Sequence, residues 1–196
     1  MKYLRMPLFA AGLMVLAAPA YAHVGAGETS SFGAGFTHPF LGLDHITVMV
    51  AVGLWAALKG GRALWVWPAT FVGVMLVGGA LGMAQVPVPF VEPGILASVV
   101  ALGLLVALAV DLPVWTGGLI IGLFAIFHGH AHGTEVPAAA SGIQYMAGFA
   151  AATALLHALG ISGALVLGKQ HREIVRVAGA ACALIGLALV AGVVEV

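Results

Sequence analysis

The sequence predicts an all-α protein: a polytopic membrane helix bundle of six transmembrane helices that follows a cleaved signal peptide. Three observations predict this fold. Of the 196 residues, 62% are hydrophobic and only 7% are charged, whereas a soluble domain carries roughly 25% charged residues. Long apolar segments alternate with short breaks that contain Gly, Pro or charged residues. The first 22 residues have the composition of a secretory signal.

Residues 1–22 have the three parts of a signal peptide. Lys2 and Arg5 form a positively charged start, residues 6–18 are apolar, and residues 20–22 read Ala-Tyr-Ala, a typical cleavage site. An uncleaved first transmembrane helix is the alternative, but the apolar stretch is short for a span and Pro19 interrupts it. We therefore expect residues 23–196 to form a single transmembrane domain.

Six apolar segments follow the signal. A membrane-spanning helix needs about 20 residues, and suitable segments occur at about 39–58, 63–83, 94–111, 114–132, 141–168 and 174–194. The third break is the weakest, because only Asp111 and Pro113 divide a run that is too long for one crossing.

The basic residues predict the orientation of these spans. Lys59 and Arg62 lie in the first loop, and Lys169, Arg172 and Arg176 lie in or near the fifth, whereas the second and fourth loops contain no Lys or Arg. Basic loops face the cytoplasm, so the mature N-terminus is expected in the periplasm, in agreement with the signal peptide. The expected location is a bacterial inner (cytoplasmic) membrane.

Composition also limits the partners. The net charge is zero and no basic stripe occurs, so a nucleic-acid partner is not expected. The expected partner of the apolar surface is the lipid bilayer. Cys182 stands alone in an apolar run and is expected to be a small buried hydrophobe. No nucleotide-binding Gly-rich motif occurs. A homo-oligomer or an accessory subunit stays open.

Polar residues cluster at two span ends, and ionisable residues in spans indicate function by default. The first cluster, HPFLGLDH, contains His38, Asp44 and His45. Pro39 suits a first helical turn, which places His38 near the start of the first span. The two histidines are seven positions apart, which puts them on one face of a helix, and Asp44 lies about 100° around the helix from His45.

The second cluster, FHGHAHGTE, ends the fourth span. In a continuous helix His128, His132 and Glu135 share a face and His130 points away, although two glycines leave the continuity of the helix open. The predicted topology places both clusters on the outer side of the membrane. We therefore expect one metal site there, rather than separate structural histidines.

The sequence leaves the roles of three further histidines less clear. His23 would begin the mature chain and could capture metal with its imidazole and α-amine, or belong to a frayed terminus. His157, within the fifth span, is either a second stop on a metal pathway or a packing residue. His171 lies in a basic loop and is expected to be solvated.

Histidine and carboxylate ligands suit nickel, cobalt, zinc or copper(II), whereas the shortage of thiolates disfavours copper(I). Both clusters also match known motifs. His38, Asp44 and His45 fit H-x5-D-H, and residues 127–135 fit F-H-G-x-A-x-G-x-E. In these motifs, and along nearly the whole chain, the sequence resembles the HupE/UreJ family of nickel/cobalt permeases, the hydrogenase- and urease-accessory type. The resemblance implies that the metal is bound by His38, Asp44, His45, His128 and Glu135; His130 and His132 fall at variable positions, and their role rests on chemistry alone.

The expected function is therefore uptake of nickel or cobalt ions from periplasm to cytoplasm to supply metalloenzyme assembly. The metal ion is the transported substrate, and neither an enzyme nor an organic cofactor is expected. Two main alternatives stay open: an intramembrane zinc-dependent hydrolase, and a metal-binding membrane subunit without transport. A haem carrier and a rhomboid-type protease fit less well. The protease would use Ser162 in its G-x-S-G string, but only His171 follows that serine.

Overall fold

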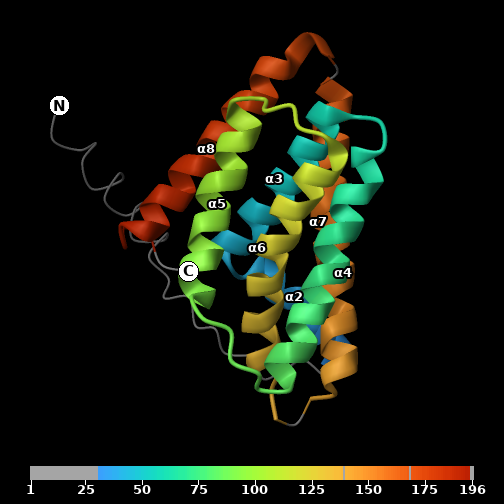
Figure 1. The fold of residues 1–196 in the computed structure, drawn as a ribbon, viewed down its shortest axis with the longest axis vertical. Helices are drawn as coiled ribbons and strands as arrows, with labels where there is room; N and C mark the ends of the chain where they lie inside the picture. Colours follow the sequence, from blue (N-terminus) through green and yellow to red (C-terminus); the bar gives the residue numbers. More distant parts are fainter. Residues whose placement is uncertain (1–30, 139, 168, 195–196) are drawn as a thin grey trace, which may run out of the picture.

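The computed structural model describes residues 31–194 except 139 and 168, and all regular structure in this part of the chain is helical (Figure 1). The expected all-α class is thus observed. The elements are α2 (Ser31–Thr37), η1 (His38–Phe40), α3 (Leu43–Lys59), α4 (Ala63–Met83), α5 (Val91–Ala107), α6 (Val114–Thr134), α7 (Gly142–Leu167), η2 (Lys169–His171) and α8 (Arg172–Val190). The expected signal peptide and His23 lie outside the described residues.

Several of these helices have the length and composition of membrane spans. Four of them, α4, α6, α7 and α8, are long and apolar enough to cross a membrane. A fifth candidate is the broken pair Ser31–Phe40 and Leu43–Lys59, which is bent by 80°. Helix α5 is apolar but has only 17 residues. The segment expected at 94–111 is thus a shorter helix, and residues 108–113 form the loop before α6.

Helix α3 lies inside the bundle. Helix α4 packs along α6 and α5 packs along α8, while α3 contacts α4, α5, α7 and α8. Most residues of α3 are buried. The surrounding helices instead expose large apolar side chains, among them Trp65, Trp115, Leu119, Leu123, Val166, Val177 and Leu184. This distribution fits a protein whose outer surface contacts lipid.

Glycines allow α4 and α6 to approach closely. Gly129 and Gly133 stand one turn apart on α6, and a Cβ atom on either would overlap the backbone of Met75 or Gly79 on α4. Small residues at this spacing are typical of membrane helix contacts. The two glycines therefore do not interrupt the helix, and α6 continues to Thr134. The sequence left open whether this helix is continuous, and the structure shows that it is.

Loops one, three and five lie at one end of the bundle, at the top in Figure 1, and the ends of α4 and α6 that lead into loops two and four lie at the other. At the first end Lys59 Nζ lies 2.5 Å from Asp111 Oδ1, and Arg176 Nε donates a hydrogen bond to the Ala107 carbonyl at 2.9 Å. The basic loops thus share an end, as the charge pattern predicts. The side of the membrane that this end faces stays a prediction.

The start of the first expected span differs from its prediction. The helical conformation ends at Phe40 and resumes with α3 at Leu43. Between them, the backbone of Gly42 is extended, with φ −99° and ψ 125°. The expectation that His38 and His45 share one helix face is therefore wrong, because they belong to two elements that meet at a sharp bend. A Cβ atom at Gly42 would lie 2.5 Å from His45 Nδ1, so this glycine makes room for the imidazole.

Candidate metal site

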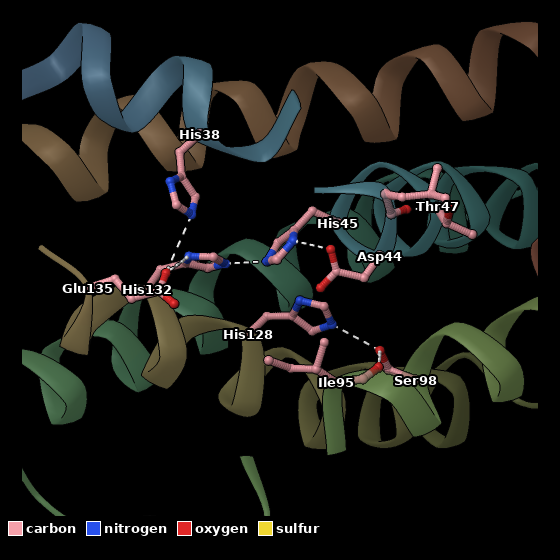
Figure 2. A network of polar contacts seen from close by, with 10 residues as sticks. His38, Asp44, His45, Thr47, Ile95, Ser98, His128, His132 and Glu135 are labelled. Carbon is pink, nitrogen blue, oxygen red and sulfur yellow. Dashed lines mark hydrogen bonds and ion pairs between the residues drawn. The ribbon is translucent and has the colours of Figure 1, made fainter. Parts of the chain in front are cut away.

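The two motifs meet at the end of the bundle opposite the basic loops, where side chains from four segments converge (Figure 2). η1 contributes one histidine, the first turn of α3 an aspartate and a histidine, α6 two histidines, and its C-terminal cap a glutamate. They are His38, Asp44, His45, His128, His132 and Glu135. All of these side chains except Asp44 form two groups of three potential ligands that share one member.

The first group, here called the inner triad, consists of His45, His128 and His132. All three are buried, and one ring nitrogen from each lies within 4.8 Å of the others. The Nε2 atoms of His45 and His132 face and contact each other. Two facing imidazole nitrogens need a proton or a cation between them. Three such nitrogens at this separation can coordinate a divalent transition metal ion.

Asp44 orients the imidazole of His45. The Nδ1–H of His45 donates a hydrogen bond to Asp44 Oδ1 at 2.6 Å, which leaves the Nε2 lone pair directed at His132. A carboxylate in this position fixes the tautomer of a metal-binding histidine and raises its basicity. The second oxygen, Oδ2, is buried and has no hydrogen-bond partner among the described residues. Asp44 thus supports His45 and keeps one oxygen available to a cation.

Ser98 orients the imidazole of His128 and fixes its tautomer. Its hydroxyl donates to the Ile95 carbonyl at 2.6 Å, so its oxygen can only accept from His128 Nε2–H, 2.9 Å away. His128 therefore carries its proton on Nε2. Its Nδ1 is buried, has no partner in the described part of the chain, and points toward His45 and Asp44 (Figure 2). Sequence reasoning missed Ser98, because a single serine in an apolar helix gives no signal of its own.

The second group, here called the outer triad, consists of His38, His132 and Glu135. Oε2 of Glu135 lies 3.2 Å from His132 Nδ1 and 3.5 Å from His38 Nε2. The side chains of His38 and Glu135 are 27% and 51% exposed, so this group opens to the surface. His132 directs Nδ1 to the outer triad and Nε2 to the inner one.

Electrostatics keep Glu135 charged. It caps α6 just beyond the helix. Hydrogen bonds from His132 and then from His38 hold the pKa of its carboxyl well below the ordinary value, despite partial burial that acts in the opposite direction. The outer triad therefore carries a carboxylate at any physiological pH.

Phe149 of α7 forms an apolar wall against both triads. Its ring centroid lies 4.1 Å from that of His132 and 6.2 Å from that of His45. Such a wall lowers the local dielectric constant and strengthens interactions with a bound cation.

Besides Asp44, which supports His45 from outside the triads, two other predicted ligands belong to neither triad. His130 points away on α6, as a continuous helix requires, and its Nε2 donates to the Val86 carbonyl at 2.8 Å. This hydrogen bond ties α6 to the loop between α4 and α5, and His130 belongs to neither group of potential ligands. His157 lies on α7 against Phe71, with ring centroids 5.1 Å apart, and belongs to neither group of ligands.

Known proteins resemble the chain over nearly its whole length. The family model described as HupE / UreJ protein matches residues 11–189. The chain belongs to the HupE / UreJ family. A curated member of this family, Protein HupE of Rhizobium leguminosarum bv. viciae, is 47% identical over 193 residues, which cover 98% of this chain and 100% of that protein. No solved structure matches the chain.

Family membership confirms the resemblance that the two motifs indicate. The matched region contains every described element from α2 to the greater part of α8 and all members of both triads. The HupE / UreJ fold seen here therefore has its most polar interior at the point where its two motifs meet.

Proposed function

We propose that this HupE / UreJ protein is an inner-membrane permease that takes up nickel, or alternatively cobalt, from the periplasm into the cytoplasm. The observation that carries the proposal is the pair of triads that share His132. One opens to the surface and the other is buried, so together they form a route for a cation from solvent into the bundle. The protein moves its substrate and does not transform it.

The proposed topology has six spans with a periplasmic N-terminus. Helix α5, with 17 residues, is about 26 Å long at a rise of about 1.5 Å per residue, close to a hydrocarbon thickness of about 30 Å. The bent first segment supplies another crossing through α3. Loops one, three and five share one end of the bundle, and the basic residues in or near loops one and five support a cytoplasmic position for this end. Both triads then lie on the periplasmic side.

Capture begins at the outer triad. The ionised Glu135 and the partly exposed His38 attract a hydrated dication, and Nδ1 of His132 supplies a third ligand when its ring carries the proton on Nε2, which faces His45. The cation next moves to the inner triad, where Nε2 of His45, Nε2 of His132 and Nδ1 of His128 replace the remaining water. A neutral imidazole has one lone pair, so the ring proton of His132 passes from Nε2 to Nδ1, where Glu135 accepts its hydrogen bond, as the ion moves from the outer to the inner triad. Such stepwise binding lets a site select a cation without trapping it.

The membrane potential supplies a driving force. A dication moving to the negative cytoplasmic side gains about 4.6 kcal/mol per 100 mV, twice the value for a single charge. The sequence contains no nucleotide-binding Gly-rich motif, so uptake driven by potential or by a gradient is the simplest scheme. The ligand set of imidazoles and carboxylates suits nickel and cobalt, and resemblance to nickel/cobalt permeases favours nickel first.

A zinc-dependent hydrolase is the second candidate, because three buried histidines also form a common catalytic zinc set. In that case the inner triad would hold zinc permanently and activate a water molecule. Permanent zinc with turnover of a lipid or peptide, and no flux, would support this candidate. A subunit that binds metal without transport would show neither flux nor turnover.

The test is uptake of radioactive nickel and cobalt into proteoliposomes under an imposed potential. We expect the wild type to accumulate metal and the His45→Ala and Asp44→Asn variants to lose uptake. His171→Ala is the matched control, because this exposed histidine caps α8 at the opposite end of the bundle. Absence of flux from folded, correctly oriented wild-type protein would rule out a stand-alone permease.

A further inference from the structure

One buried histidine has no role in either triad. His157 of α7 is 1% exposed, and neither of its ring nitrogens has a hydrogen-bond partner in the part of the chain that the structure describes. Buried polar groups almost always have a partner, and each exception needs an explanation. A packing role alone would be served equally well by an apolar side chain.

Buried polar side-chain atoms that lack a hydrogen-bond partner occur in two places in the described part of the chain. Among the described residues they are Asp44 Oδ2, His128 Nδ1 and both ring nitrogens of His157. The first two face the inner triad, where a cation would satisfy them (Figure 2). The same reasoning applied to His157 indicates a second position where a passing cation or its water would complete the hydrogen-bonding or coordination of the imidazole.

His157 lies directly inward from the inner triad. It follows Phe149, which contacts His45 and His132, by two helical turns, or about 12 Å along α7. The ring of Phe71 separates the two places, with centroids 5.8 Å from His128 and 5.1 Å from His157. One aromatic side chain thus stands between the inner triad and the next imidazole.

Other polarisable groups line the same interval. Thr153 precedes His157 by one turn on α7, and its hydroxyl donates to the Met75 sulfur at 3.7 Å. Both side chains are fully buried. A thioether and a hydroxyl are weaker ligands than imidazole, but they are softer surroundings for a cation than an aliphatic wall.

Beyond His157 the interior becomes apolar. Trp55 and Trp67 pack with ring centroids 4.3 Å apart, and their indole N–H groups donate to the carbonyls of Val110 and Val114. Among the described residues, His157 is the one buried histidine or carboxylate that lies away from the end of the bundle where the two triads are found. It is therefore the last strong ligand before this aromatic pair.

We propose that His157 is an inner station for the transported divalent transition-metal ion, reached after the ion leaves the inner triad and passes Phe71. The proposal rests on the proposed permease function. A single imidazole binds a cation more weakly than three, so the ion pauses at His157 and is released inward. This order of affinities favours passage rather than storage.

A matched pair of variants separates a station from a packing residue. Leucine and methionine have similar volumes, and exchange between them is well tolerated in cores, but only methionine offers a ligand. His157→Leu removes two unpaired polar atoms, so it should unfold at the same or a higher temperature than the wild type. Nickel binding at equilibrium should be unchanged in both variants, because neither triad contains His157.

The decisive readout is nickel flux in proteoliposomes. We expect His157→Leu to lower the initial rate by about tenfold or more, and His157→Met to recover a measurable part of it. Wild-type flux in His157→Leu would overturn the proposal and leave the permease function intact. Equal loss of flux in both variants, together with weakened nickel binding or unfolding, would also overturn it by showing a structural role. Absence of flux in the wild type would instead reject the permease function and this inference with it.

Discussion

Nδ1 of His132 lies 3.2 Å from Oε2 of Glu135, at the surface end of a ring whose opposite nitrogen contacts His45. One imidazole thus connects an exposed carboxylate to a buried histidine. This arrangement joins the outer and inner triads, and most of the following predictions depend on it.

Replacement of His132 is expected to abolish tight nickel binding. His132→Ala removes one ligand from each triad. His130→Ala is the matched control, since His130 lies on the same helix and donates to a loop carbonyl instead. Isothermal titration with nickel should show loss of binding for His132→Ala only. His130→Ala should keep its affinity and lose about 1 kcal/mol of stability. Equal loss of binding in both variants would contradict the assignment of the triads.

Ser98 is expected to control metal affinity through His128. Ser98→Ala removes the acceptor of the His128 Nε2–H, and loss of such supporting contacts typically weakens metal binding by about 10- to 100-fold. Ser98→Thr keeps the hydroxyl and should restore most of the affinity. The visible spectrum of bound cobalt should change in Ser98→Ala and return to the wild-type form in Ser98→Thr. An unchanged spectrum and affinity in Ser98→Ala would show that the hydrogen bond does not set the tautomer.

The pH dependence of nickel binding is expected to come from the histidines and not from Glu135. Hydrogen bonds from His132 and His38 lower the pKa of Glu135 well below its ordinary value, so this carboxylate stays ionised as the pH falls from about 7 to about 5. Imidazoles bind metal only when deprotonated, so affinity should fall once the pH is low enough for protons to compete for these ligands.

Glu135→Gln tests this assignment. The variant should bind nickel more weakly than the wild type, because it lacks the charge of the carboxylate, and its acid loss should begin at a lower pH, because His132 and His38 lose the anion that favours their protonation. Titration calorimetry at several pH values measures both curves. Disappearance of the acid loss in Glu135→Gln would indicate that Glu135 itself titrates in this range.

The contact between α4 and α6 is expected to limit stability. A Cβ at Gly129 would overlap the Met75 backbone, and overpacking of this kind typically costs about 1–3 kcal/mol. Gly129→Ala should therefore lower the unfolding temperature in detergent. Gly163→Ala on α7 is the control, because an added Cβ there meets nothing within 4 Å; alanine in a helix interior should stabilise it by about 0.5–1 kcal/mol. The opposite order of the two unfolding temperatures would argue against a tight α4–α6 contact.

The sequence could predict the helices and the two polar clusters because both depend on local composition. Apolar runs and basic loops identify the spans, and the charge pattern alone brings the two motifs to one end of the bundle. The position of His130 away from the other histidines of α6 also follows from helical periodicity.

Other features depend on contacts between helices, which periodicity cannot supply. The hydrogen bond of Ser98 to His128 joins α5 to α6. The bend at Gly42 depends on space for His45 and Asp44. A glycine can break a helix or bring two helices together, and only the neighbouring helix decides between these roles, as Gly129 shows.

The most direct test of the central claim is nickel accumulation by wild-type and His132→Ala protein in proteoliposomes, measured with and without an inside-negative potential. The account predicts accumulation by the wild type that increases with the potential, and only the background of protein-free liposomes for His132→Ala. Equal accumulation by the two proteins, or none by folded wild type under an imposed potential, would contradict a transport route through the shared histidine.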